Sequence, residues 1–359
     1  MNRNKIKQSW ILFRQWLSRH RRAVIIVGSI LIVLIGALIT CLILFRPAEN
    51  TTAKTIVKPK PIIKYYSPLT GVRVANEAAT EKAVTGIMIE NSPDARPQSG
   101  LKDSGVVFEA IAEGGITRFL VLYQLEKPQL IGPVRSLRLY DIDWLAAFNA
   151  SIGHVGGSAA ALNEIRNGSY RDIDQFFNYQ YYWRSTDRWA PHNVYTSFAK
   201  LDELNISKGY ITSKFTGFSR VDGKPVKKPN ATNINIVISG FLYDSSYLYN
   251  AKTNTYARSQ AGEPHLDRES GQITPSVVIA MRVNESTVYE DGYRESITTI
   301  GSGNAYIFQN GTVKKATWHK TSKLDQITFT DAKGDNIPLV RGQTWIAAVP
   351  NDGGDVTWR

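Results

Sequence analysis

Three side chains in this 359-residue sequence are the candidates for a general acid or base: Glu113, His154 and His192. His154 precedes Ser158 by a short turn, so a Ser–His nucleophilic pair is one interpretation, although the residues do not spell Gly-x-Ser-x-Gly. His192 lies in the segment 184–193, which either completes a polar site or forms a loop packed by its tryptophans and proline. These residues make a hydrolase or transferase one hypothesis, without a complete catalytic motif.

Glu113 stands at a predicted β-hairpin whose turn is formed by the two glycines at 114–115. Such a turn predicts that Ile111 lies opposite Arg118, and that Glu109 and Glu113 flank Arg118 on one face of the sheet. Four residues of strand separate the two carboxylates by about 13 Å, whereas glycosidase carboxylates stand about 5 to 9.5 Å apart. We therefore expect an ion-paired sheet face, unless one carboxylate works with a partner elsewhere.

Basic residues surround the predicted start of a helix at Ser136, its expected N-cap. Arg135 and Arg138 bracket this position and oppose the helix dipole, a conflict that a bound phosphate or carboxylate would remove. Arg96 and Arg118 complete the predicted anion-binding set. The alternative is pairing within the protein, of Arg138 with Asp141 and of Arg135 with Glu90 or Glu113.

A second strand, turn and helix junction follows His154. Gly156 and Gly157 suit a tight turn, and Ser158 is the expected N-cap of the next helix. Because exposed N–H groups at a helix start bind anions, these three residues join the predicted ligand-binding set. The turn and the cap are also a sufficient reason for their presence.

We expect no metal and no cofactor. His265 with Glu263 and Asp267 offers ligand chemistry, but such a triad beside a proline is more often a turn. The segment 331–336 lacks the length and the terminal Glu of a calcium loop and predicts a hairpin turn. No P-loop or dinucleotide fingerprint is present. The C-terminal tryptophans are expected in the core, with a glycan-stacking surface as the alternative: Trp318, Trp345 and Trp358.

Residues 66–217 alternate strand-like and helix-like runs, which is typical of a mixed α/β domain. The expected strands are Ile87–Ile89, Val106–Ala112, Ile116–Tyr123 and Ser151–Val155, and the expected helices are Leu137–Phe148, Ala159–Arg166 and Ser197–Leu204. A join follows at 218–229. Residues 230–359 carry short β-type runs between turn signals, so we expect a second, mainly β domain.

The N-terminal segment predicts a membrane anchor. Residues 23–45 contain no charge and reach about 34 Å as a helix, enough to cross a hydrocarbon core and contact membrane lipid. The arm at 1–22 is basic, so the positive-inside rule places it in the cytoplasm and the rest of the chain outside. Residues 46–65 have the Pro, Thr and Lys composition of an extended linker.

Two alternatives to the anchor concern how the segment is processed. A cleaved secretory signal is disfavoured, because the apolar run is too long and lacks a small-x-small site before Arg46. A lipoprotein signal is the second alternative, with Cys41 as the acylated residue. Thr40 directly before the cleavage position and the apolar residues 42–45 after it argue against lipid attachment.

The net charge of +12 does not indicate nucleic-acid binding. Residues 1–46 hold eight of the 43 Lys and Arg residues and none of the 31 acidic residues, which leaves the remainder at +4. No basic stripe with interleaved aromatic residues is present there. Cys41 is the single cysteine, so the part after the anchor has no disulfide and depends on its cores.

Several motifs resemble the YerB-like putative lipoprotein family. The matching runs are Tyr66–Gly71, Ile89–Asn91, Ala95–Leu101, Glu113–Phe119, Ile131–Ser136, His154–Ser158, Gly301–Gly303, Trp318–Lys320 and Gly342–Ile346. The resemblance covers nearly all of the chain after the linker and implies a two-part envelope protein of unknown function. It supplies no catalytic residue.

Three hypotheses follow for a membrane-anchored protein of the cell envelope. The first, which we favour, is binding of an anionic envelope ligand such as wall glycan, peptide carboxylate or phosphate polymer. The second is an envelope hydrolase or transferase that uses Glu113 or His154 as general acid or base. The third is a scaffold that recruits envelope proteins through residues 230–359. The residues favour a binding protein over an enzyme, but the fold class alone does not choose among the three.

Overall fold

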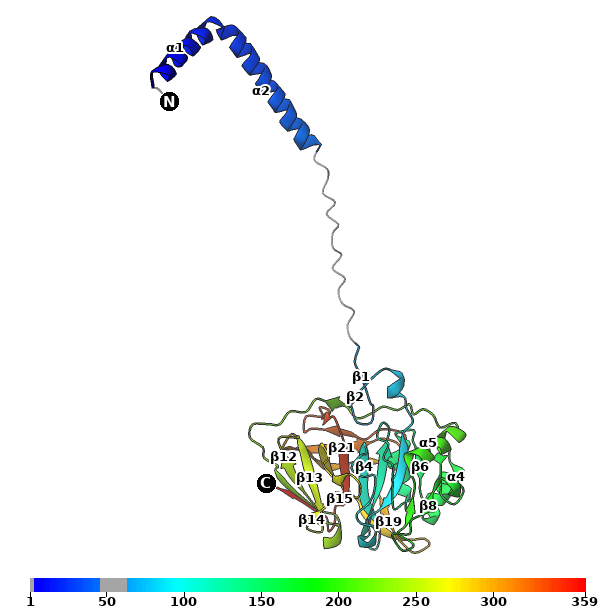
Figure 1. The fold of residues 1–359 in the computed structure, drawn as a ribbon. Helices are drawn as coiled ribbons and strands as arrows, with labels where there is room; N and C mark the ends of the chain where they lie inside the picture. Colours follow the sequence, from blue (N-terminus) through cyan, green and yellow to red (C-terminus); the bar gives the residue numbers. More distant parts are fainter. Residues whose placement is uncertain (1–2, 46–62) are drawn as a thin grey trace. The chain divides into compact units, whose positions relative to one another are not determined.

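The structure is a computed structural model that describes residues 3–45 and 63–359 (Figure 1). The chain divides into two units, Met1–Ile62 and Ile63–Arg359, and each is described by itself. The linker expected over 46–65 lies outside the described residues from 46 to 62.

The described residues 3–45 of the first unit form two helices, α1 (Arg3–Arg19) and α2 (Arg21–Leu44), drawn in blue in Figure 1. Helix α2 is long and apolar enough to cross a membrane, and none of its residues is buried within the unit. An apolar helix is thus present where the membrane-spanning helix is expected, with the observed bounds Arg21–Leu44 in place of 23–45. Cys41 lies inside α2, close to its C-terminal end.

A ten-stranded sheet runs through the second unit. In spatial order its strands are β22 (Thr328–Thr330), β21 (Thr312–Lys320), β20 (Gly301–Gln309), β17 (Val277–Val283), β24 (Thr344–Pro350), β4 (Val106–Glu113), β5 (Ile116–Tyr123), β3 (Thr85–Glu90), β6 (Ser151–Gly153) and β7 (Arg171–Asp172). The two halves meet where β24 pairs in parallel with β4, from Thr344 opposite Val106 to Ala347 opposite Glu109. A mixed α/β part and a strand-rich C-terminal part are both present, as expected, and they share this sheet.

Both faces of the sheet are covered, which explains why β4, β5 and β24 are almost continuously buried. One face packs against α3 (Leu139–Ala146) and α4 (Ala159–Asn167), with Phe108 stacked on Trp144. The opposite face packs against α5 (Phe198–Ser207) and a five-stranded sheet. In Figure 1, α4 and α5 lie at one side of the unit and β12 to β14 at the other.

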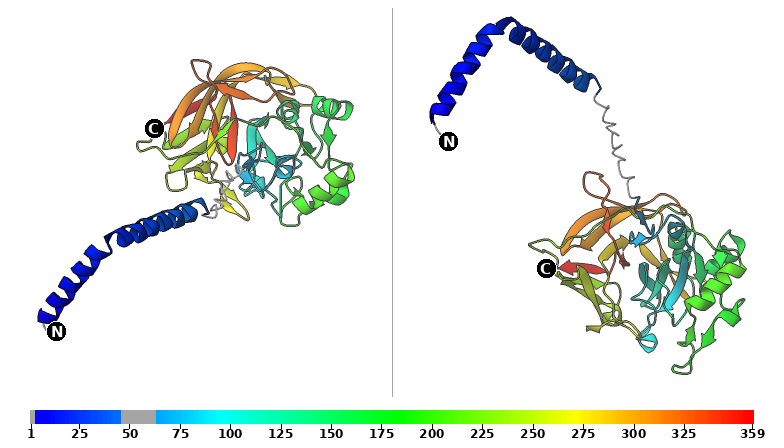
Figure 2. Two further views of the ribbon diagram at one scale, coloured as in Figure 1. Left: turned by 90° about the horizontal axis from the view of Figure 1, so that it is seen from above. Right: turned by 45° about the horizontal axis from the view of Figure 1, so that its top comes forward.

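The five-stranded sheet closes the C-terminal part as a sandwich. Its strands, in order, are β14 (Glu263–Pro264), β13 (Thr255–Gln260), β12 (Ser245–Asn250), β11 (Asn233–Val237) and β25 (Asp355–Trp358). Strands β12 and β13 alternate buried and less buried residues, as strands with one covered face do. The buried positions of these strands, such as Tyr247 and Tyr256, belong to the same apolar cluster as Trp345. Figure 2 shows these yellow-green strands facing the orange strands of the larger sheet.

Short pairs and turns complete the unit. The pairs are β1 (Tyr65–Tyr66) with β2 (Arg73–Val74), β8 (Trp183–Arg184) with β9 (Val194–Tyr195), β10 (Arg220–Val221) with β23 (Leu339–Val340), β15 (Leu266–Asp267) with β16 (Gly271–Gln272), and β18 (Glu285–Tyr289) with β19 (Tyr293–Ile297). Four 3-10 turns lie at Ala78–Thr80, Pro93–Ala95, Tyr179–Tyr181 and Phe241–Tyr243. The hairpin turn expected at 331–336 is confirmed by a bridge between Thr330 and Asn336.

Two local predictions are wrong for identifiable reasons. The helix expected from Leu137 begins at Leu139 with Arg138 as N-cap, so Ser136 is not the cap. Arg135 and Leu137 instead hydrogen-bond to the turn after β6: Leu137 donates its N–H to the carbonyl of Gly156 over 3.0 Å, and the carbonyl of Arg135 accepts the N–H of Val155 at 3.0 Å. The strand expected over Ser151–Val155 ends at Gly153.

The hairpin of β4 and β5 contains a bulge that the sequence did not reveal. Glu113 lies opposite Ile116 as expected, but Ile111 lies opposite Thr117, and Arg118 lies opposite Ala110. The register shift between Ile111 and Glu113 places Glu113 beside Arg118 and leaves Glu109 on the other face. The prediction that two carboxylates flank Arg118 is therefore wrong.

Candidate functional site

Glu90, at the end of β3, is the centre of a partly exposed polar cluster. Its side chain is only 4% accessible, and Oε1 accepts hydrogen bonds from Ser92 Oγ at 3.0 Å and faces His192 Nδ1 at 2.9 Å. Arg135 Nε lies 3.2 Å from the same oxygen. Within the described residues, the buried Oε2 atom has no hydrogen-bond partner. The cluster gathers a carboxylate, a guanidinium, an imidazole and a hydroxyl.

The backbone around residues 133–135 brings these distant residues together. Glu90 donates its main-chain N–H to the carbonyl of Pro133 over 2.9 Å, and Arg135 donates its main-chain N–H to the carbonyl of Met88 over 2.9 Å. On the other side, Val134 donates to the carbonyl of Val194 over 2.7 Å. This segment lies between β3 and β9, so the side chains of Arg135 and His192 meet at Glu90.

Arg135 is the predicted arginine that retains free binding capacity. Its side chain is 24% accessible, and its two terminal nitrogens donate no hydrogen bond to any part of the protein that the structure describes. His192 is 22% accessible beside it, with Nε2 3.9 Å from Asp94 Oδ2. A guanidinium presents its donors as a planar fork that suits a carboxylate or a phosphate. This side of the cluster can take an anion.

Arg118 and Arg138, by contrast, are both occupied by Glu113. Arg118 Nη2 lies 2.8 Å from Glu113 Oε1, and Arg138 Nη2 donates to Glu113 Oε2. Burial raises the pKa of Glu113, but the two guanidinium groups outweigh it and lower that pKa to about 2. Arg118 Nη1 donates to the carbonyl of Ser136 at 2.9 Å, and Arg138 Nη1 donates to that of Leu137 at 2.9 Å. These buried arginines therefore belong to an internal ion cluster.

Arg96 binds the protein main chain as well. Its Nη2 donates to the carbonyls of Asn91 and Leu242, each at 2.8 Å, and its guanidinium lies over the ring of Tyr243. Arg96 thereby connects the segment after β3 to the C-terminal part of the unit. The four predicted arginines do not converge: Arg118 and Arg138 share Glu113, whereas Arg96 and Arg135 contact different residues.

The second predicted junction is structural. Ser158 Oγ accepts the N–H of Ala161 at 3.4 Å, which confirms the expected N-cap. Gly156 has a φ of +60°, and a Cβ there would lie 3.1 Å from the ring of Phe176. These constraints explain the glycine and the serine without a ligand.

His154 does not form a nucleophilic pair with Ser158. It is fully buried, with Nδ1 2.8 Å from the carbonyl oxygen of Gly156 and Nε2 3.1 Å from Asp172 Oδ1. Asp172 also accepts the N–H of Asp174 at 2.8 Å. The imidazole thus connects the turn to β7, and within the described residues neither ring nitrogen hydrogen-bonds to a hydroxyl, as a Ser–His pair requires.

The loop around His192 exposes its aromatic residues. Trp189 is 90% accessible and Trp183 is 37% accessible, so the alternative of a loop packed by its tryptophans is wrong. The carbonyl of Trp189 accepts the N–H of His192 at 2.9 Å, so the exposed Trp189 belongs to the same turn as His192 of the Glu90 cluster. Asn193 turns inward, where Arg184 Nη1 donates to its Oδ1 at 2.7 Å.

A buried network on the opposite face of the sheet was not predicted. Arg258 Nη2 donates to Glu109 Oε2 at 2.7 Å, and Trp345 Nε1 donates to the same oxygen at 2.9 Å. Arg258 also contacts His265, whose Nε2 faces Gln98 Oε1 at 3.0 Å. The signal available in the sequence was Glu109, a charged residue in the middle of the apolar run of β4.

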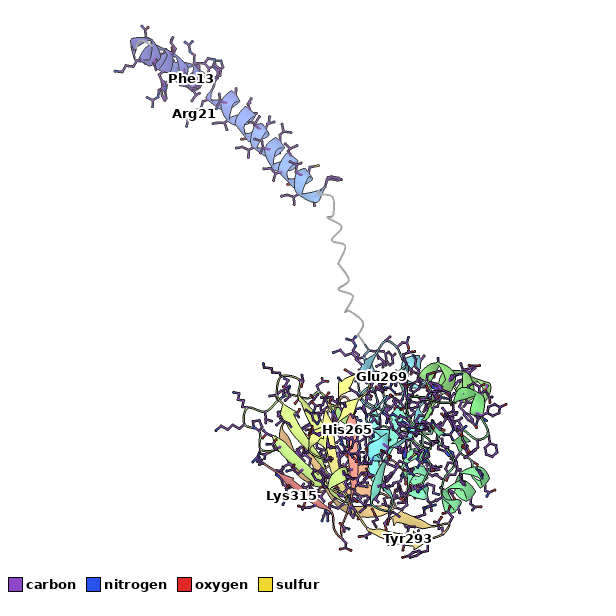
Figure 3. The ribbon with its side chains drawn as sticks, turned by 60° about the horizontal axis from the view of Figure 1, so that its bottom comes forward. Phe13, Arg21, His265, Glu269, Tyr293 and Lys315 are labelled. Atoms are coloured by element: carbon purple, nitrogen blue, oxygen red, sulfur yellow. The ribbon has the colours of Figure 1, made fainter. Side chains whose placement is uncertain are left out.

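His265 occupies this network instead of a metal site. Burial, with the nearby charge of Arg258, keeps the pKa of His265 well below its ordinary value. Figure 3 labels His265 within the second unit. Among residues 3–45 and 63–359, no group of three or more His, Cys, Asp or Glu side chains is arranged to hold a metal ion. Trp318 and Trp345 are buried as expected, and Trp358 packs on Phe308.

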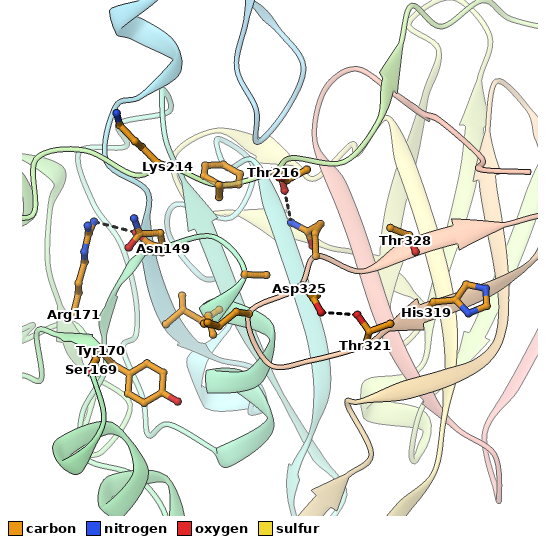
Figure 4. A pocket seen from close by; sticks show the side chains of 17 residues that line it. Asn149, Ser169, Tyr170, Arg171, Lys214, Thr216, His319, Thr321, Asp325 and Thr328 are labelled. Carbon is orange, nitrogen blue, oxygen red and sulfur yellow. Dashed lines mark hydrogen bonds between the residues drawn. The ribbon is translucent and has the colours of Figure 1, made fainter.

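A cavity of about 630 Å³ lies between residues of the N-terminal and C-terminal parts (Figure 4). It is lined by the end of α3 and the segments 169–171 and 214–216 of the N-terminal part, and by residues 319–328 of the C-terminal part. None of the residues predicted from the sequence to bind or catalyse lines it.

Comparison with known proteins identifies the relatives of this chain. Residues 69–211 match the N-terminal domain, and residues 234–346 the C-terminal domain, of the family described as "Protein of unknown function (DUF3048)". The chain belongs to this family. A Bacillus subtilis (strain 168) protein named "Putative lipoprotein YerB" is 30% identical over 298 residues, which are 82% of this chain and 88% of that protein.

The family has a solved structure with the same fold. The crystal structure of the YerB protein from Bacillus subtilis superposes with a TM-score of 0.73 at 29% identity, over 82% of this chain and 100% of that chain. The resemblance seen in the sequence motifs is confirmed. Together, the lipoprotein name of this relative and the apolar helix α2 indicate a membrane-associated protein of the cell envelope.

Proposed function

We propose that this family member is a single-pass membrane protein whose extracytoplasmic unit binds an anionic group of a cell-wall polymer through Arg135. The observation that carries the proposal is the accessible guanidinium of Arg135, whose terminal nitrogens have no acceptor within the described residues. The proposal covers topology, the ligand and its site, and each is argued below.

The topology follows from α2 and its basic flank. The 24 residues of α2 span about 36 Å as a helix, which exceeds a hydrocarbon core of about 30 Å. Arg14, Arg19, Arg21 and Arg22 precede the apolar stretch, and no acidic residue occurs before Glu49. The positive-inside rule therefore favours a cytoplasmic N-terminus. Because α2 continues past Cys41, we favour an uncleaved anchor over a lipid attached to that cysteine.

The ligand chemistry follows from the groups that the cluster leaves available. Arg135 offers two terminal nitrogens, and His192 offers an imidazole beside it, while Glu90 behind them orients both side chains. Such donors favour carboxylate or phosphate oxygens. Trp189, which adjoins His192 in the loop, adds an apolar surface that suits the ring of a sugar.

The alternative functions receive less support from the geometry. Glu113 is held between two arginines that lower its pKa to about 2, so it is a weak base and carries no proton to donate near neutral pH. His154 is fully buried, with its ring nitrogens facing a main-chain carbonyl and a carboxylate, so a substrate cannot reach it. The scaffold hypothesis assigns partner recruitment to residues 230–359. Strand β24 of this part pairs with β4 of the N-terminal part, so a fragment of residues 230–359 alone would lack the strand that β24 pairs with.

The experiment is co-sedimentation of the full chain with purified insoluble cell wall. The protein is kept in an uncharged detergent without a sugar headgroup, and pelleting is measured across a salt series. We expect pelleting that weakens with salt, and a weakening of about tenfold for Arg135→Ala, since charge-assisted hydrogen bonds are lost. Arg294→Ala is the matched control, because Arg294 pairs with Asp291 in the β18–β19 hairpin.

The outcomes separate the parts of the proposal. A wild-type protein that stays in the supernatant at every salt concentration rejects wall binding. Salt-sensitive pelleting that is equally strong in the Arg135→Ala variant rejects the site and leaves the ligand class standing.

A further inference from the structure

The cavity of about 630 Å³ is separate from the Arg135 cluster and is built by both family domains (Figure 4). Its volume falls within the range of about 300 to 1,000 Å³ that is usual for small-ligand pockets. One wall carries Asn149, Ser169 and Tyr170 from the N-terminal part, and the other carries His319 and Thr328 from the C-terminal part.

The charged residues that line the cavity are already paired within the protein. Arg171 Nη1 donates to the carbonyls of Asn149 at 3.0 Å and Thr212 at 2.7 Å. Lys214 Nζ lies 3.3 Å from Glu81, and the Asp325 carboxylate accepts from the hydroxyl of Thr321. Because Glu81 balances Lys214, and Arg171 and Asp325 carry opposite charges, the charged groups at the lining favour neither an anionic nor a cationic ligand.

Neutral polar side chains supply the free hydrogen-bonding groups. Within the described residues, the side chains of Asn149, Ser169, Thr216 and Thr328 make no hydrogen bond to the protein, although all four line the cavity. An asparagine amide offers two donors and one acceptor, and each hydroxyl offers both functions. These groups match hydroxyl and amide substituents of a ligand.

Ring faces supply the apolar part of the lining. Tyr170 is oriented by a hydrogen bond from its hydroxyl to Glu164 Oε1 at 2.5 Å, and Phe215 packs edge-on against Phe148. Leu324 adds an exposed aliphatic surface. Aromatic and aliphatic faces beside neutral polar groups suit a sugar ring, which presents C–H groups on its faces and polar groups at its edge.

The C-terminal wall is held in place before any ligand arrives. Lys320 is 1% accessible, and its Nζ donates to the carbonyls of Lys323 at 2.9 Å and Asp325 at 2.5 Å. Lys323 in turn lies 2.6 Å from Glu164 and 3.3 Å from Asp143 of the N-terminal part. These contacts fix the loop at 321–326 against the helices, so little ordering remains for binding to provide.

We propose that this cavity binds an uncharged, N-acetylated sugar segment of a glycan, with Asn149 hydrogen-bonded to an acetamido group. This site is distinct from the anion site at Arg135 and does not depend on it. An acetamido group carries one donor and one acceptor, which the amide of Asn149 complements.

The test is calorimetric titration of the full chain with tri-N-acetylchitotriose, in an uncharged polyoxyethylene detergent that has no sugar headgroup. Maltotriose, which lacks acetamido groups, is the comparison ligand. We expect the acetylated trisaccharide to bind about tenfold more tightly than maltotriose, as the loss of about one hydrogen-bonded pair implies.

Two variants locate the binding to the cavity. Asn149 has a φ of +48°, so Asn149→Gly removes the amide while keeping a backbone conformation that glycine adopts freely, and should weaken binding about fivefold. Ser169→Trp should abolish binding by filling the cavity. Asn254→Gly is the matched control, because Asn254 also has a positive φ, of 57°, and does not line the cavity.

We expect the wild type and the Asn254→Gly control to bind the acetylated trisaccharide with equal affinity. Asn149→Gly should bind it more weakly, and Ser169→Trp should not bind it. Absence of binding to the wild type, equal binding of maltotriose, or unchanged affinity in either cavity variant overturns the proposal. Because Arg135 is not altered, failure of this experiment leaves the wall-binding proposal untouched.

Discussion

Arg258 Nη2 lies 2.7 Å from Glu109 Oε2, and neither side chain is accessible to solvent. The pair joins β13 of the five-stranded sheet to β4 of the ten-stranded sheet, across 149 positions of sequence. Trp345 in β24 donates to the same carboxylate. One buried ion pair thus connects residues of the two family domains at the place where their strands meet.

Loss of Arg258 should destabilise the whole second unit. Arg258→Met leaves the Glu109 carboxylate buried without its counter-charge, so we expect the free energy of unfolding to fall by about 3–5 kcal/mol. Chemical denaturation of the variant and the wild type measures this difference. The control is the double variant Glu109→Gln with Arg258→Met, which should lose less than Arg258→Met because no uncompensated charge remains. A loss below about 1 kcal/mol in Arg258→Met contradicts this account.

The Glu113 cluster should make stability depend on acid pH. The folded pKa of Glu113 is about 2, below its ordinary value of 4.5, so its ionised form stabilises the folded state. This contribution is fully present above about pH 4.5 and is lost as the pH falls toward 2. Urea unfolding of the wild type and Glu113→Gln should therefore differ most above pH 4.5 and converge toward pH 2. A constant difference across this range would falsify the assignment.

Ser158 should act on stability and not on binding. Ser158→Ala removes the N-cap of α4 and should lower the free energy of unfolding by about 1 kcal/mol, while wall pelleting stays unchanged. Ser158→Thr, which keeps a hydroxyl, should retain most of the stability. Weaker pelleting by Ser158→Ala at equal folded fraction would instead return this residue to the binding site.

Cys41 should be dispensable for membrane attachment. If α2 is an uncleaved anchor, Cys41→Ser keeps the full-length protein in the membrane fraction after an alkaline carbonate wash. In the same cells, protease added outside should remove the second unit and spare the basic arm. Release of the Cys41→Ser variant, or accumulation of a longer precursor, would show that the cysteine carries a lipid.

Much of the fold follows from local sequence signals. The strand Ile116–Tyr123 is observed with the predicted bounds, and the helix at 159 begins after its predicted cap, Ser158, because apolar periodicity and capping are local properties. The helix expected from Ser197 is observed at Phe198–Ser207, with Ser197 as its N-cap. The bulge before Glu113 escaped prediction, since one extra strand residue leaves no distinct signature in composition.

The candidate site depends on pairing between distant segments, which the sequence does not reveal. His192 and Glu90 are 102 positions apart and meet only because residues 133–135 hydrogen-bond to two different strands. The pairing of Arg135 with Glu90, considered as an alternative to anion binding, is observed, and it still leaves the terminal nitrogens of Arg135 free. Ser136 was misplaced because Arg135 and Leu137 hydrogen-bond to residues 155–158, so the helix begins only at Leu139.

The most direct test of the central claim compares two substitutions of Arg135 in a wall-binding titration of the full chain. Arg135→Lys keeps a positive charge and should retain most of the binding, whereas Arg135→Gln removes the charge and should weaken binding about tenfold and reduce its salt dependence. Equal binding by the wild type and Arg135→Gln, at equal folded fraction, would contradict the assignment of Arg135 as the residue that holds an anionic wall ligand.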